Sequence, residues 1–163
     1  LVRHLCEDPI AVEFAIWLHD YFNLTMAGRH QNEERSGQVA KEFALELGLP
    51  ISFAEKAERM ILATKHEKPV QDVDTQILLD LDLVVLGSNE RLFQKYEEGI
   101  RKEYDWVYDE QFYLRRLNIL QMFMQRSHVY FTDYFRSRYE QQARENLNRS
   151  IQQARAIIEA RKS

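Results

Sequence analysis

The sequence contains little of what a disulfide-rich, turn-rich or membrane-embedded protein needs. Cys6 is its only cysteine, so no disulfide can form within the chain, and we expect a reducing, cytoplasmic location. Five glycines and three prolines in 163 residues leave few breaks, which favours long helices over a fold with many turns. No apolar run is long enough to cross a bilayer and no signal peptide is recognisable, so we expect no membrane partner.

The sequence also has no large excess of charge of either sign. It has 22 Lys and Arg against 26 Asp and Glu, and the resulting net charge of −4 argues against a nucleic-acid polymer as partner. Its 45% apolar and 29% charged residues are typical of a soluble protein, and 163 residues suit one domain with a sizeable core. We therefore expect a single domain over residues 1–163. Because residue 1 is Leu rather than Met, we also expect the natural N-terminus to be missing.

Apolar spacing predicts an all-α fold of about seven helices, with no strand pattern that competes. Asp8 suits the N-cap of the first helix and Pro9 its first position. Asn32 is expected to cap the second helix, because Glu33 and Glu34 then lie in the first turn, where the helix dipole favours acids. The expected ranges are 8–20, 32 to about 48, 52–66, 74–87, about 89–103, 110–126, and 133 to the end.

The last predicted helix has a long amphipathic pattern. Its apolar residues step by four and three, as the packed face of a helix requires. They are Phe135, Tyr139, Ala143, Leu147, Ile151, Ala154 and Ile158. This face would pack either within the chain or against a partner protein.

The stretch AIWLHDYFN, residues 15–23, places His19 and Asp20 directly after an apolar helix. Carbonyl groups at the C-terminal end of a helix carry partial negative charge and favour a cation. An imidazole nitrogen and a carboxylate are also good ligands for a divalent metal. Because the dipeptide is common by chance, it is a weak signal for a metal site when taken alone.

Two carboxylates, Asp80 and Asp82, interrupt the otherwise apolar run LLDLDL at residues 78–83. A buried carboxylate has to be neutralised, paired or metal-bound. On a helix, positions two apart point about 200° from each other, so only one of the two faces a given site. A helix cap or a salt bridge to an arginine is the alternative to a metal ligand.

Shorter polar stretches supply further candidates. In ATKHE, residues 63–67, His66 ends a predicted helix, where a histidine is more often a surface residue than a ligand. In NEERS, residues 32–36, Glu33 or Glu34 would lie near a metal-bound water and Arg35 would bind phosphate. Favourable chemistry at a helix start explains the two glutamates equally well. Arg101, in IRKEY at residues 100–104, is explained equally by a solvated helix face.

The order of these stretches resembles the HD-domain superfamily of metal-dependent phosphohydrolases. The matching segments are WLHD, NEERS, ATKH, LLDLDLVVLG and IRKEY, followed by VYFTDYF and QQARENL, so the resemblance covers nearly the whole chain. It is closest to a bacterial branch of predicted HD phosphohydrolases without an assigned substrate. The resemblance implies an all-helical bundle of the HD type, one or two divalent metal ions, and hydrolysis of phosphate esters, often of nucleotides.

The superfamily pattern is a first histidine, then the HD pair, then a distant aspartate. His19 and Asp20 match the pair. Asp82 is preferred for the distant aspartate, and Asp80 is left open. Only His4 lies upstream of the pair, and the Tyr-His-Asn-like stretch of this branch does not occur in the sequence.

The resemblance also implies roles for the remaining candidates. His19, Asp20, and Asp82 or Asp80 would bind Mn²⁺, Mg²⁺, Fe²⁺ or Zn²⁺, which such ligands do not distinguish sharply. His66 would contact a second metal or the phosphate.

For the reaction, Asp20 would orient the attacking water, and Glu33 or Glu34 would act as general base. Lys65, His66 or Arg35 would offset charge on the phosphoryl oxygens, and Arg35 and Arg101 would bind the substrate.

The expected substrate is a small phosphorylated molecule, with nucleotides among the candidates, and a homodimer is left open. Two other functions remain as alternatives. One is a catalytically degenerate HD fold that senses a nucleotide or a metal, and the other is a helical interaction protein.

Overall fold

The computed structural model describes residues 2–22, 31–65 and 70–160. Within these ranges it contains seven α-helices and no strand, which confirms the all-α prediction. The contacts divide the chain into two compact units, Leu1–Asp82 and Leu83–Ser163, which are described separately below. The single domain expected over residues 1–163 stays a prediction. None of the described helices combines the length and the apolar character needed to cross a membrane.

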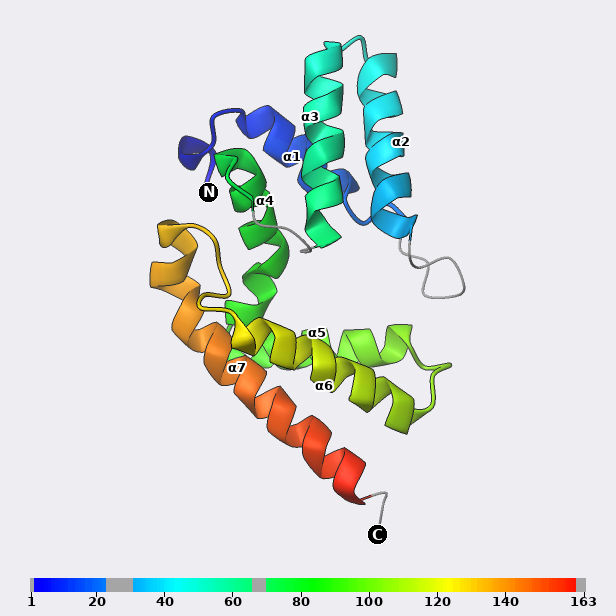
Figure 1. Cartoon of the computed structure of the whole chain (residues 1–163), viewed down its shortest axis with the longest axis vertical. Helices are drawn as coiled ribbons and strands as arrows, with labels where there is room; N and C mark the ends of the chain where they lie inside the picture. The colour runs from blue at the N-terminus through cyan, green and yellow to red at the C-terminus, as the bar shows by residue number, and fades with distance from the viewer. Residues whose placement is uncertain (1, 23–30, 66–69, 161–163) are drawn as a thin grey trace. The chain divides into compact units, whose positions relative to one another are not determined.

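The first unit contains helices α1 to α4. A short 3₁₀ helix η1 (Arg3–Leu5) precedes α1 (Pro9–Leu18), and α2 (Asn32–Glu46) and α3 (Ile51–Leu62) form an antiparallel hairpin (Figure 1). A second 3₁₀ turn, η3 (Ala63–Lys65), follows α3, and α4 (Val73–Asp82) ends the unit. Their apolar faces share one core, formed by Ala11, Val12, Ala15, Ala40, Met60, Ile61, Ile77 and Leu78.

The first two helix starts differ in how well the sequence predicted them. The Asp8 carboxylate accepts a hydrogen bond from the Ala11 N–H at 3.0 Å, which confirms Asp8 as the N-cap and Pro9 as the first residue of the helix. The predicted cap at Asn32 is wrong, because Asn32 is the first helical residue and its side chain is buried. Gly48 follows the end of α2 and has a φ of 74°, a left-handed conformation that favours glycine.

The buried carboxylate of Asp74 fixes where α1 begins. It accepts hydrogen bonds from the Glu7 N–H at 2.7 Å and the Asp8 N–H at 2.9 Å, and it pairs with the Lys56 ammonium at 2.5 Å. Asp74 is fully buried, so these partners replace the water that its charge would otherwise require. Because Asp74 is in the first turn of α4, this contact holds the starts of α1 and α4 side by side.

We expect Asp74→Ala to lower the free energy of unfolding by about 3 kcal/mol, because it removes one member of a buried ion pair and leaves two amides without an acceptor. Urea denaturation followed by circular dichroism measures this. Glu55→Ala, an exposed carboxylate on α3, is the matched control and should change stability by less than about 0.5 kcal/mol. Equal effects of the two substitutions would contradict the anchoring role of Asp74.

The second unit is built around the long helix α7 (Asp133–Ala160). The 3₁₀ helix η4 (Leu83–Gly87) leads into α5 (Glu90–Glu103) and α6 (Asp109–Gln125), and both α6 and η4 pack against α7. Six of the seven residues of the predicted stripe on the last helix are buried, and the seventh, Tyr139, is half-buried. The stripe is therefore used for packing within the unit.

The segment LVVLG, residues 83–87, was predicted as the end of one helix over residues 74–87, and this prediction is wrong. The α-helix ends at Asp82 and a 3₁₀ helix follows. Carbonyl groups of this segment bind side chains instead: Leu83 accepts from the Tyr130 hydroxyl at 3.2 Å, and Leu86 accepts from the Asn146 amide at 2.8 Å. A Cβ on Gly87 would lie 2.6 Å from the Tyr139 Cβ, so this close approach of η4 to α7 requires glycine.

Candidate functional site

His19 lies directly after α1, and its ring orientation is fixed by the helix itself. The Nδ1 atom is 2.8 Å from the Ile16 carbonyl oxygen. Because a carbonyl oxygen can only accept, Nδ1 carries a proton and donates it. The second ring nitrogen, Nε2, is therefore the one left to bind another group, as in histidines that ligate metals.

The Nε2 atom of His19 faces two carboxylates. It lies 3.3 Å from an oxygen of Asp20 and 3.3 Å from an oxygen of Asp82. The side chains of His19, Asp20 and Asp82 are 16%, 73% and 25% exposed, so the cluster is covered on the histidine side and open to water on the Asp20 side. The structure thus brings together three predicted site residues, the outermost of which, His19 and Asp82, are 63 positions apart in sequence (82 − 19).

The cluster is strongly attractive to positive charge. Burial lowers the pKa of His19, but the hydrogen bonds and negative charges of Asp20 and Asp82 outweigh it and raise the pKa to about 10. In addition, α1 and α4 both end here, at Leu18 and Asp82, and helix C-termini carry partial negative charge. At neutral pH the metal-free cluster therefore holds a protonated imidazole between two carboxylates.

Two separations within the cluster, those from His19 Nε2 to the two carboxylates, are compatible with a shared divalent metal ion. Two ligand atoms that each lie ~2.1 Å from one ion are about 3.0–3.4 Å apart at ordinary coordination angles. Both 3.3 Å separations from His19 Nε2 fall within that interval. Across residues 2–22, 31–65 and 70–160, however, no group of three or more His, Cys, Asp or Glu side chains is already arranged around a common metal position. A metal would take the place of the His19 proton.

The structure separates the two aspartates of LLDLDL. Asp82, the last residue of α4, contacts His19, whereas Asp80 is fully buried inside the unit. His4 lies in η1, before the start of α1, and the ten-residue helix α1, about 15 Å long, separates it from His19. His66 lies outside the described residues.

Contacts tie the start of α2 to the segment that follows the HD pair. The Phe22 N–H donates to the Ser36 hydroxyl at 3.0 Å, and the Arg35 guanidinium lies over the Phe22 ring at 4.3 Å from its centre. These contacts hold the NEERS segment close to residues 19–22. Sequence reasoning missed Ser36, because a serine near the start of a helix is ordinary.

Glu34 and Lys65 form an ion pair, and their charges offset each other. The hydrogen bond from Lys65 lowers the pKa of Glu34. Glu34 is therefore committed to Lys65, whereas Glu33, which is half-buried, forms no such pair in any contact described. Of the two glutamates predicted as general base, Glu34 is thus the one whose charge is already offset by a partner.

Arg101 lies in the second unit, where it holds the turn between α5 and α6. Its guanidinium donates to the Asp109 carboxylate at 2.6 Å and to the carbonyl oxygens of Tyr104 at 2.6 Å and Val107 at 3.2 Å. These contacts give Arg101 a structural role. Its predicted contact with substrate stays a prediction.

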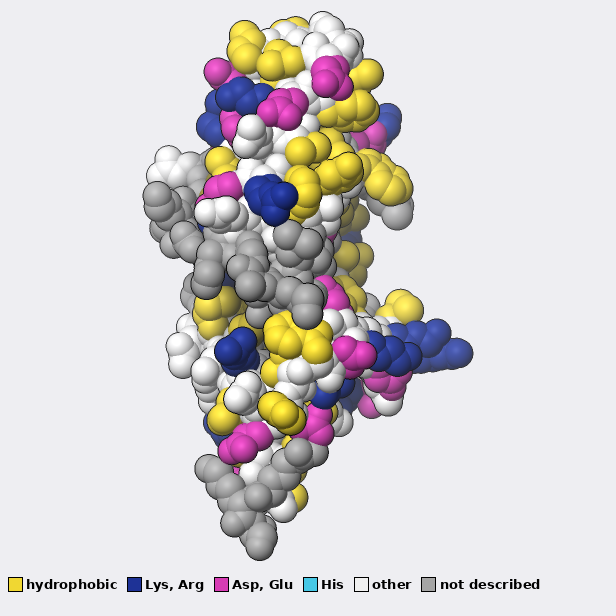
Figure 2. Space-filling view, turned by 90° about the vertical axis from the view of Figure 1, so that its right-hand side faces the viewer, with side chains coloured by type: hydrophobic (Ala, Val, Ile, Leu, Met, Phe, Trp, Pro, Cys, Tyr) yellow, Lys and Arg dark blue, Asp and Glu magenta, His cyan; other side chains and the backbone are white. Residues whose placement is uncertain are grey.

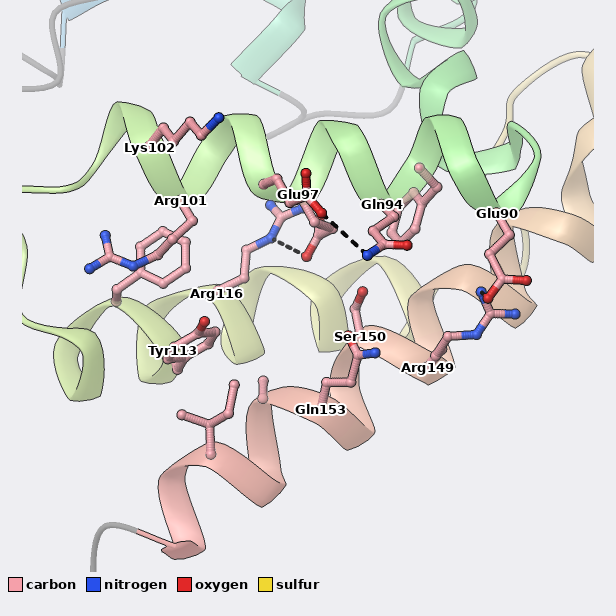
Figure 3. A pocket seen from close by; sticks show the side chains of 15 residues that line it. Glu90, Gln94, Glu97, Arg101, Lys102, Tyr113, Arg116, Arg149, Ser150 and Gln153 are labelled. Atoms are coloured by element: carbon pink, nitrogen blue, oxygen red, sulfur yellow. Dashed lines mark hydrogen bonds and ion pairs between the residues drawn. The ribbon is translucent and has the colours of Figure 1, made fainter.

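A pocket of about 490 Å³ lies between α5, α6 and α7 of the second unit (Figure 3). Its polar groups mostly bind each other: Arg116 pairs with Glu97, and Arg149 pairs with Glu90 at 2.9 Å. No histidine, cysteine or aspartate lines it. The His19 cluster therefore has the stronger chemical case as a catalytic site.

Comparisons with protein-family models, with curated proteins and with solved structures gave no match. The HD-domain resemblance therefore rests on the sequence motifs and stays a prediction.

We expect the His19 imidazole of the metal-free protein to titrate far above pH 6.5, near pH 10, and Asp82→Asn to bring its pKa down toward the ordinary value. NMR titration of the histidine ring signals measures both values. A pKa near 6.5 in the unsubstituted protein would contradict the contacts with Asp20 and Asp82.

The same shift makes stability depend on pH. Because the folded pKa lies above the unfolded value of 6.5, the stabilisation is fully present below pH 6.5 and is lost as pH rises through about 10. We therefore expect thermal stability of the metal-free protein to fall across this interval, and to fall less in Asp82→Asn. Differential scanning calorimetry at several pH values measures it.

Proposed function

We propose that the first unit binds a divalent metal ion through His19, Asp20 and Asp82 and hydrolyses the phosphate ester of a small molecule, with nucleotides among the candidate substrates. The observation that carries this proposal is the imidazole whose Nδ1 is tied to the Ile16 carbonyl and whose Nε2 faces two carboxylates at 3.3 Å. The order of sequence motifs that resembles the HD-domain superfamily supports it independently.

The three ligands suit different parts of the task. His19 is the buried, rigid member, so its Nε2 offers one fixed direction. Asp82 is held on α4, and Asp20 is open to water, where its second oxygen would accept a hydrogen bond from the attacking water. When bound, the metal ion would supply a water acidic enough to attack near neutral pH and would polarise a phosphoryl oxygen.

Residues of the first turn of α2 would complete the site. Glu33 would accept the proton of the attacking water, because Glu34 is already paired with Lys65. Arg35, whose guanidinium lies over Phe22, would bind a phosphoryl oxygen. Lys65 would contribute positive charge only where the substrate phosphate displaces Glu34 from it.

A sensor that binds metal or nucleotide without turnover is the second candidate. The observation that favours it is the small number of ligands, since three side chains of the described residues surround the proposed position and His4 is remote. A helical interaction protein built on the last helix has less support, because the stripe of that helix is packed inside the second unit.

We expect Mn²⁺ or Zn²⁺ to bind the chelator-treated protein with the release of about one proton per ion near pH 7.5, because the metal replaces the proton on His19 Nε2. Isothermal titration calorimetry in two buffers with different ionisation heats measures the proton count. His19→Ala and Asp82→Asn should each weaken metal affinity at least ~10-fold. Asp133→Asn, whose side chain is 99% exposed, is the matched control and should bind as the unsubstituted protein does.

We expect the metal-loaded protein to release phosphate from at least one member of a panel of nucleotides and phosphate monoesters, and Asp20→Asn and Asp82→Asn to lower the rate at least ~100-fold. A phosphate-release assay measures the rates, with Asp133→Asn again as control. Metal binding without any turnover would favour the sensor. Retained binding and turnover in Asp82→Asn, with loss of both in a folded Asp80→Asn, would show that the wrong aspartate was assigned.

A further inference from the structure

Helix α1 is apolar on nearly every side, which is unusual for a helix at a protein surface. Ala11, Val12 and Ala15 occupy the side that faces the core. Its only charged residue, Glu13, is neutralised by an ion pair with Arg3. An α-helix with this composition is normally covered on both sides, and in α1 the side away from the core is exposed.

The exposed side of α1 continues onto α2 as one surface, here called the α1–α2 face. Residues 10, 14 and 17 follow one another at helical spacing on α1, and Tyr21 lies in the turn after the helix. The Phe14 ring stacks on Phe43 with 6.0 Å between centres. Leu47 lies one turn beyond Phe43. The face consists of Ile10, Phe14, Trp17, Tyr21, Phe43 and Leu47. Figure 2 shows hydrophobic side chains, interspersed with charged ones, on the side of the first unit where α2 lies.

The exposed fractions on this face are large. Trp17 is 84% exposed, Ile10 65%, Tyr21 61%, Leu47 57% and Phe43 44%. With ~150–250 Å² for a whole aromatic side chain and somewhat less for Ile and Leu, they present on the order of 600 Å² of apolar surface. This reaches the upper end of the largest apolar patch on a typical monomeric protein, and patches of that size are often functional.

We propose that the α1–α2 face is the interface of a symmetric homodimer, in which the same face of a second copy covers it. Two such faces bury on the order of 1,200 Å², which reaches the lower end of stable, specific interfaces before any polar rim is counted. None of its six residues is charged, so the centre of such a contact brings no like charges together, although each chain has a net charge of −4. An isologous contact needs this kind of self-complementary patch. The proposal does not depend on the proposed hydrolase activity.

Trp17 is the expected centre of the interface, because buried tryptophans dominate the binding energy of protein interfaces. We expect the full chain to dimerise in sedimentation velocity experiments over micromolar concentrations. Trp17→Glu should raise the dimer dissociation constant at least ~30-fold. It should leave the melting temperature unchanged at concentrations where the unsubstituted chain is monomeric, since the side chain is 84% exposed in the single chain. Tyr108→Glu, at a position 81% exposed in the second unit, is the matched control and should leave dimerisation unchanged.

Tryptophan fluorescence distinguishes burial of Trp17 by a second copy from burial by residues of the same chain. Trp17 and Trp106 are the two tryptophans of the sequence, so Trp106→Phe leaves Trp17 as the only reporter. We expect its emission to move to shorter wavelength as the dimer forms, and to return on dilution. A chain that stays monomeric, with emission at short wavelength at every concentration, would overturn the proposal in favour of cover by its own residues. A dimer that Trp17→Glu leaves intact would overturn it as well.

Discussion

The first unit depends on one buried ion pair, between Asp74 and Lys56, whose carboxylate also accepts two backbone hydrogen bonds. A carboxylate without water has to be satisfied by the chain, and Asp74 is satisfied by the residues that start α1. The contact therefore aligns the beginning of α1 with the beginning of α4. At their other ends the two helices meet again, where His19 contacts Asp82. Two helices joined start to start and end to end run side by side in the same sense.

This alignment explains the electrostatics of the candidate site. Because α1 and α4 run in the same sense, their C-terminal ends gather at His19, and the carboxylates of Asp20 and Asp82 add to the partial charges there. The imidazole is mostly buried, yet its pKa is raised to about 10, because the two carboxylates outweigh the cost of burying the charge. In the metal site proposed here, a divalent cation would have to compete with that proton.

The predictions from sequence were most accurate where the signal is local. The seven helices follow from the period of apolar residues and the scarcity of glycine and proline. The cap at Asp8 was predictable because Pro9, the next residue, suits the first position of a helix. They were least accurate where distant side chains compete for the backbone. The cap at Asn32 is wrong because that side chain is buried, and the helix over 74–87 changes at Asp82 because Tyr130 and Asn146 bind carbonyl groups of residues 83–87. No feature of residues 83–87 themselves predicts those partners.

Residue type and short-range spacing were enough to predict the helical class and the set of groups that could carry chemistry. They also predicted that only one of Asp80 and Asp82 faces a given site, because a helix turns about 100° per residue. Only the folded chain shows which aspartate contacts His19, since that depends on how α4 is rotated against α1. It also shows that Glu34 is paired with Lys65 and that one side of α1 is left uncovered, because both depend on which side chains meet when the helices pack.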